Sequence, residues 1–149
     1  MVANITVPSW DEYFLGIAKA VAARAKCSRR RVGAVLVLDR RIIATGYNGA
    51  ASGLPDCLEG ACPRGQLSYD EIPGLGDYDR PGTPGFCIAI HGEVNALLYA
   101  THDTQGAVAY ITDQPCPGCR KALAAAGIVR AVWPDGEFDK DGLSDWTRH

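Results

Sequence analysis

Two short patterns, each placed where a predicted helix begins, most constrain how this chain can fold: HGE at residues 91–93 and PCPGC at residues 115–119. One histidine and two cysteines supply three zinc ligands, and a catalytic zinc site keeps its fourth position open for water. Helix N-termini carry exposed N–H groups and positive dipole ends, which help thiols bind metal as anions. The glutamate lies too near the histidine for a fourth ligand, but it can reach water at the open position. The predicted site residues are therefore His91, Glu93, Cys116 and Cys119.

Hydrophobic periodicity and turn signals predict an α/β fold. Ser9 and Glu12 form a capping box before a helix over residues 10–25. Two apolar runs separated by three polar residues predict a β-hairpin over 32–38 and 42–45. Helix, strand, helix and strand are then expected over 92–100, 107–112, 117–126 and 128–133. This order implies a mixed β-sheet sandwiched between helices, a three-layer α/β/α arrangement.

The length of 149 residues predicts a single domain over residues 1–149. Residues 50–90 stand apart, because they carry seven Gly, five Pro and three Cys without sustained periodicity. Such a stretch indicates an insertion that is functional or tied down. The tail after residue 133 is polar, with Trp146 as its one expected anchor. Because this tail is short, we expect a fifth strand to be missing or rearranged.

Charge and hydropathy exclude several classes of protein. The formal net charge is −2, which argues against a surface built to grip nucleic acid. No apolar run approaches the roughly 18–20 residues of a membrane span, and the N-terminus lacks the pattern of a signal peptide. These features predict a cytoplasmic protein without membrane or nucleic-acid partners. Clustered cysteines in a reducing compartment favour metal binding or catalysis over disulfides.

The sequence resembles the deoxycytidylate (dCMP) deaminase family of the cytidine deaminase superfamily. H-x-E followed by P-C-x-x-C is typical of zinc-dependent nucleobase deaminases. The resemblance runs from about residue 10 to residue 133. It is carried by VGAV, TGYNG, HGE and PCPGC at residues 32–35, 45–49, 91–93 and 115–119.

The resemblance implies the cytidine deaminase fold and zinc-dependent hydrolysis of dCMP to dUMP, which supplies thymidylate synthesis. It also implies that His91, Cys116 and Cys119 bind the catalytic zinc. Glu93 would act as the proton shuttle, and Asn48 would hydrogen-bond the nucleoside; by spacing alone, Asn48 reads as a turn residue. Family members are commonly homo-oligomers, often hexamers.

Four further cysteines remain once the PCPGC pair is set aside. Four thiolates can form a closed structural zinc site, which would tie the insertion down. Four ordinary free thiols are the alternative, and a metal held by only some of them is another. By resemblance, some family members carry a second zinc near positions matching the first two cysteines of the set. This set is Cys27, Cys57, Cys62 and Cys87.

Residues 24–31 carry five positive charges in a chain that is net negative. A solvated patch at a helix C-terminus explains them equally well. Because arginine binds phosphate with two parallel hydrogen bonds, this segment is also a candidate monophosphate site. The candidates are Arg29, Arg30 and Arg31, and the sequence leaves open which of them points inward.

The sequence departs from the family pattern in three places. Gly92 stands where the family commonly has Ala, and Asp113-Gln114 before PCPGC is unusual and alters pocket polarity. Ala51 stands where Pro is common, in a segment linked to the effectors dCTP and dTTP. Regulation by these triphosphates is therefore in doubt.

Two other functions stay open at this stage. One is deamination of tRNA adenosine or another nucleic acid, which the acidic balance and the cysteine-bearing insertion disfavour. The other is a non-catalytic, zinc-stabilised binding protein. Glu93 favours an enzyme over this non-catalytic protein, because a structural zinc site needs no carboxylate beside an open position.

Overall fold

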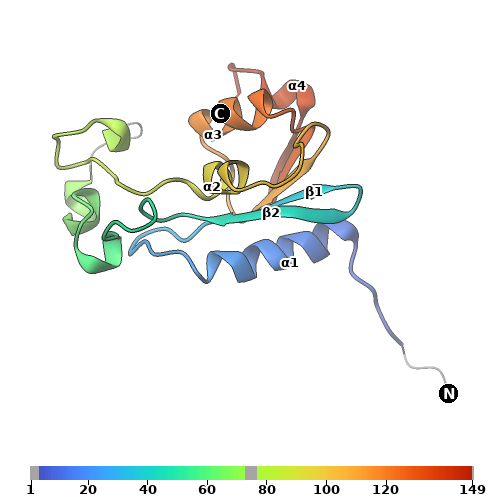
Figure 1. The fold of residues 1–149 in the computed structure, drawn as a ribbon, viewed down its shortest axis with the longest axis horizontal. Helices are drawn as coiled ribbons and strands as arrows, with labels where there is room; N and C mark the ends of the chain where they lie inside the picture. Colours follow the sequence, from blue (N-terminus) through green and yellow to red (C-terminus); the bar gives the residue numbers. More distant parts are fainter. Residues whose placement is uncertain (1–3, 73–76, 149) are drawn as a thin grey trace.

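The computed structural model describes residues 4–72 and 77–148, whose strands form one mixed sheet (Figure 1). The strands lie in the order β2-β1-β3-β4-β5. β3 and β4 pair in parallel, whereas every other neighbouring pair is antiparallel. Their bounds are β1 (Gly33–Leu38), β2 (Arg41–Tyr47), β3 (Val108–Ile111), β4 (Arg130–Trp133) and β5 (Gly136–Asp139).

Helices cover both faces of this sheet. α1 (Trp10–Ala22) lies on one face, and α2 (Gly92–Leu98), α3 (Pro117–Ala125) and α4 (Lys140–Leu143) lie on the other (Figure 1). Both hydrogen bonds of the predicted capping box open α1. Two buried clusters, one on each face, hold the layers together. The predicted three-layer α/β/α fold is confirmed.

The expectations for the tail need correction. A fifth strand is present and pairs antiparallel with β4. Trp146 is 55% exposed, whereas Phe138 and Leu143 are 5% and 0% exposed, so Trp146 is not the one anchor. Pro-Asp-Gly at residues 134–136 is a turn signal typical of such a hairpin.

A buried arginine joins this tail to α3. Arg120 is 2% exposed and follows directly after Cys119. Its guanidinium donates hydrogen bonds to the carbonyls of Gly142, Asp145 and Arg148 at 2.9, 2.5 and 2.6 Å. Burying this charge is favourable only because those acceptors surround it. The end of the chain therefore supports the helix that carries two cysteines of the predicted site.

The insertion contains short 3-10 turns in place of long elements, namely η1 (Cys57–Glu59), η2 (Arg64–Gln66), η3 (Tyr69–Glu71) and η4 (Asp77–Asp79). Backbone hydrogen bonds between Gly49 and Ile90 close its base. It lies beyond one end of the sheet (Figure 1). Among the described residues, no helix has the length and apolar character needed to cross a membrane.

Candidate active site

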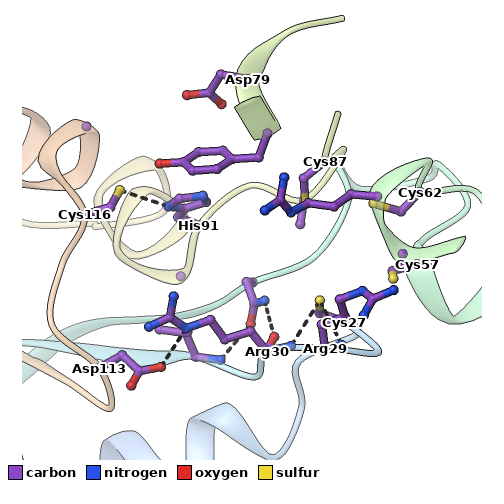
Figure 2. A pocket seen from close by; sticks show the side chains of 18 of the residues that line it. Cys27, Arg29, Arg30, Cys57, Cys62, Asp79, Cys87, His91, Asp113 and Cys116 are labelled. Carbon is purple, nitrogen blue, oxygen red and sulfur yellow. Dashed lines mark hydrogen bonds and ion pairs between the residues drawn. The ribbon is translucent and has the colours of Figure 1, made fainter. Parts of the chain in front are cut away.

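A cavity of about 810 Å³ opens between the insertion and the end of the sheet at which α2 and α3 begin. Figure 2 shows His91 and Cys116 on one side of it and Cys57 and Cys62 on the other. The turn that follows α1 supplies Arg29 and Arg30 between these sides (Figure 2). The cavity thus brings together most of the residues selected from the sequence.

His91, Cys116 and Cys119 form a compact ligand group at two helix N-termini. His91 and Cys116 are the residues that precede the first turns of α2 and α3. His91 Nδ1 lies 3.2 Å from Cys119 Sγ and 3.5 Å from Cys116 Sγ. Nitrogen and sulfur ligands of tetrahedral zinc lie about 3.6 Å apart, so the three donors fit one zinc ion.

The charges within this group follow from its hydrogen bonds. A hydrogen bond from Cys119, with burial opposing it, lowers the pKa of Cys116 to about 3. The same contact with Cys116 raises the pKa of the Cys119 thiol, and the hydrogen bond to Cys116 also raises the pKa of His91. Because a metal needs both cysteines as thiolates, its binding releases a proton from Cys119.

Glu93 lies in the first turn of α2 and is 4% exposed. Burial raises the pKa of its carboxyl, although hydrogen bonds from its own backbone N–H and from Cys119 oppose the shift. A carboxyl with a raised pKa is well suited to accept and return protons near neutral pH. Its position beside the three ligands matches the acid–base role expected from the sequence.

The close approach of β2 to α2 positions this group. A Cβ added to Gly46 would lie 2.3 Å from the Ala96 nitrogen and the Gly92 carbonyl oxygen. Asn95 Nδ2 also donates to the Tyr47 carbonyl at 2.9 Å. Glycine in TGYNG thus lets the backbone of the ligand-bearing helix rest directly on the sheet.

Asn48 is 7% exposed at the cavity wall and holds the turn after α1. Its Oδ1 accepts from the Val32 N–H at 2.8 Å, and its Nδ2 donates to the Arg30 carbonyl at 2.7 Å. An amide nitrogen carries two hydrogens, so one remains to face a ligand.

The structure separates the three candidate arginines. Arg29 lines the cavity, and its buried Nε has no hydrogen-bond partner within residues 4–72 and 77–148. Arg30 also lines the cavity and pairs with Asp113, at 3.1 Å from Nε to Oδ2. Arg31 turns away, because its guanidinium donates to the carbonyls of Ala23 and Ala25 at 2.5 and 3.3 Å. The Arg31 guanidinium therefore binds the segment just after α1 and is directed away from the cavity.

Among the cavity residues that sequence reasoning missed are Arg64, Tyr78 and Lys121. The Tyr78 ring lies 5.5 Å from the His91 ring, centroid to centroid. Burial raises the pKa of its hydroxyl, and Cys116 raises it further. Arg64 and Tyr78 lie in the insertion, which has no periodicity, so nothing in the sequence indicated that they reach the site; Lys121 lies in α3, one turn after Pro117.

The four other cysteines line the opposite side of the cavity, but they are spaced more widely. In the part of the chain that the structure describes, only His91, Cys116 and Cys119 gather their ligand atoms within 4.8 Å. Burial alone would raise the pKa of Cys57, yet hydrogen bonds from Ser28 outweigh it and lower the pKa. Burial raises the pKa of Cys87 to about 11.

Comparison with known proteins agrees with this chemistry. Residues 8–134 match the family described as the cytidine and deoxycytidylate deaminase zinc-binding region. The chain belongs to this family. It is therefore a zinc-dependent hydrolytic deaminase, as the HGE and PCPGC motifs predict, and the predicted family and enzyme class are confirmed.

Individual relatives support the same family assignment. The deoxycytidylate deaminase of Mycobacterium phage D29 is 51% identical over 128 residues, which cover 85% of this chain and 95% of the phage protein. That of Saccharomyces cerevisiae is 39% identical over 134 residues, 89% of this chain but 39% of the yeast protein. The dCMP deaminase of cyanophage S-TIM5, solved with dCMP and dUMP, has a TM-score of 0.59 and 27% identity. That match covers 83% of this deaminase chain and 79% of the phage chain.

Proposed function

We propose that this deaminase hydrolyses dCMP to dUMP and ammonia, which would supply dUMP for thymidylate synthesis. The observation that carries the proposal is the buried Glu93 carboxyl beside the His91, Cys116 and Cys119 group, in a cavity that also holds arginine. The names of the phage D29 and yeast relatives, and the nucleotides bound to the cyanophage enzyme, support dCMP as the substrate.

Glu93 would move the protons of this reaction. Zinc held by His91, Cys116 and Cys119 supplies Lewis acidity, which makes water nucleophilic near neutral pH. Glu93 accepts the proton of the water that attacks C4 of cytosine and donates a proton to N3. It then takes the proton of the new C4 hydroxyl group and delivers it to the exocyclic amine, so that C4 becomes a carbonyl and the amine leaves as ammonia. The raised pKa of the Glu93 carboxyl suits it to both directions of transfer.

The arginine end of the cavity would hold the 5′-phosphate. Arg29 is the foremost candidate, because its buried Nε has no partner among the described residues. Arg30 can contribute once its pair with Asp113 is exchanged for phosphate. Asn48 would use its remaining amide hydrogen on the nucleoside.

A second, structural zinc at Cys27, Cys57, Cys62 and Cys87 remains a proposal. Three consecutive backbone N–H groups, from Ser28 to Arg30, point at the sulfurs of Cys27 and Cys57. Such N–H donors stabilise thiolate, the form that binds zinc. The sulfurs would have to move closer together, because no three of them meet the spacing of the catalytic group within the described residues.

Assembly into a homo-oligomer, such as a hexamer, and a cytoplasmic location also stay predictions. Regulation by dCTP and dTTP stays in doubt because of Ala51.

Substrate comparison with a zinc count on the same sample tests the function. We expect ultraviolet absorbance to report turnover of dCMP and much weaker turnover of deoxycytidine, CMP and dCTP. About two zinc ions per chain would support the second site, and about one would remove it. No turnover of any nucleotide despite bound zinc would contradict the proposal and favour a nucleic-acid substrate or a non-catalytic protein.

A further inference from the structure

The turn after α1 is organised around sulfur. The backbone N–H groups of Arg29 and Arg30 donate to Cys27 Sγ at 3.4 and 3.5 Å. The preceding N–H, that of Ser28, donates to Cys57 Sγ at 3.5 Å, and the Ser28 hydroxyl lies 3.0 Å from the same sulfur. Successive N–H groups that converge in this way form a concave anion-binding nest. Here the side chain of Cys27 fills that nest from within the turn.

Two of the arginines that line the cavity, Arg29 and Arg30, leave the chain from this same turn. Arg29 lies over the Tyr69 ring, with its guanidinium carbon 5.0 Å from the ring centroid. Arg30 reaches Asp113 in the loop before Cys116. Arg31, one residue further on, points to the end of α1. Of the three consecutive arginines, the backbone of the turn thus directs Arg29 and Arg30 toward the cavity and Arg31 away from it.

We propose that Cys27 is a positioning residue for the phosphate end of the substrate: its sulfur holds the Arg29 and Arg30 backbone so that both guanidinium groups face the cavity. This inference rests on the proposed function, because dCMP supplies the phosphate. Arginine binds phosphate through a planar, directional fork, so a small rotation of the turn weakens binding. The reaction at C4 takes place beside Glu93, which stands on α2 and not on the turn, so we expect the turn to affect KM more than kcat.

Steady-state kinetics of Cys27→Ala with dCMP test this role. We expect KM to rise on the order of tenfold, a loss comparable to one charge-assisted hydrogen bond, while kcat stays within about twofold. The inhibition constant of inorganic phosphate should rise in parallel. Cys27→Ser should recover part of the affinity, because its hydroxyl oxygen can still accept N–H groups. A merely structural role would reduce the active fraction and leave the phosphate inhibition constant unchanged, which would overturn the inference.

Cys62→Ser separates the sulfur of the turn from any metal bound nearby. It removes a sulfur of the same group but neither hydrogen bond to Cys27. We expect the phosphate inhibition constant to rise much less in Cys62→Ser than in Cys27→Ala, whatever the zinc content of the two variants. Equal increases would overturn the inference, because loss of metal would then explain both.

Kinetics of the unmodified enzyme distinguish a failure of the role proposed for Cys27 from a failure of the proposed function. An enzyme that turns over dCMP and is not inhibited by inorganic phosphate would overturn the role of the turn alone. An enzyme that turns over no nucleotide would overturn the proposed function itself.

Discussion

The two sulfur-bearing sides of the cavity are built in different ways. His91, Cys116 and Cys119 stand at the starts of two helices that pack on the sheet, with the buried cluster of one sheet face behind them. Cys57 and Cys62, on the facing side, stand in or near a 3-10 turn of the insertion. The ligand atoms of the first group lie within 4.8 Å of one another, whereas no three cysteines of the second group meet that spacing within the described residues.

The difference shows what orders each side. Packing between elements far apart in the chain places the three predicted zinc ligands. A few contacts place the cysteines of the insertion, among them the hydrogen bonds between Ser28 and Cys57. The close approach of the Gly65 backbone to Cys57 is another of these contacts, because a Cβ added to Gly65 would lie 2.4 Å from Cys57 Sγ. We therefore expect loss of metal to abolish catalysis on the first side and to loosen the insertion on the second.

Removing one sulfur from each side gives the largest expected contrast. Cys119→Ala should lower turnover of dCMP at least about a thousandfold, because a catalytic zinc ligand is lost. Cys57→Ala should keep turnover within about tenfold and make the insertion more sensitive to limited proteolysis. Kinetics, zinc content and proteolysis of both variants make the measurement. Equal losses of turnover would break the comparison, since both groups would then serve the chemistry.

Glu93→Gln tests whether the side of the cavity that holds His91 uses Glu93 to carry protons, separately from metal binding. We expect turnover to fall about 10²–10⁴-fold, because the amide cannot shuttle protons. Zinc content and thermal stability should stay near those of the unchanged protein, because Glu93 is not a ligand of the metal group. The matched control is Glu137→Gln, at the exposed sheet edge, which should keep turnover. Retained activity in Glu93→Gln would remove Glu93 as the proton carrier.

Arg120→Met tests how much the contacts between α3 and the C-terminal tail contribute to the stability of the fold. The change removes the guanidinium that donates hydrogen bonds to three backbone carbonyls. The free energy of unfolding should therefore fall by about 3 kcal/mol. Denaturant unfolding measures the loss. Lys19→Met, on the exposed face of α1, should change stability by less than about 0.5 kcal/mol. A neutral Arg120→Met would show that the tail does not support α3.

Asp11→Asn should have the smallest effect, and one that depends on pH. A hydrogen bond from Arg130 lowers the pKa of Asp11 from its ordinary value of 3.8, although burial opposes the shift. The stabilisation is therefore present above pH 3.8 and lost as pH falls through the lower pKa of the folded state. The partly exposed pair contributes less than about 1 kcal/mol at neutral pH. Thermal unfolding of both proteins from pH 7 to pH 2 should converge at the acid end; a constant difference would contradict this.

Several features were predictable because they depend on neighbours in the chain. The capping box at Ser9 and Glu12 and the helix starts at HGE and PCPGC are local signals, and the structure contains all three. Other features were not predictable. Nothing local separates Arg31 from Arg29, because the three arginines are consecutive and differ only in what lies opposite each of them.

The amino-acid sequence by itself determined the chemistry of this protein, because zinc ligation and acid–base catalysis require particular side chains at particular spacings. Those side chains are readable in His91, Glu93 and PCPGC. Only the tertiary structure decided what meets at the cavity: that Tyr78 lies against His91, that Arg29 faces inward, and that Arg120 ties the tail to α3. These contacts join segments far apart in the chain, and such contacts arise from packing, which leaves no periodic signal in the sequence.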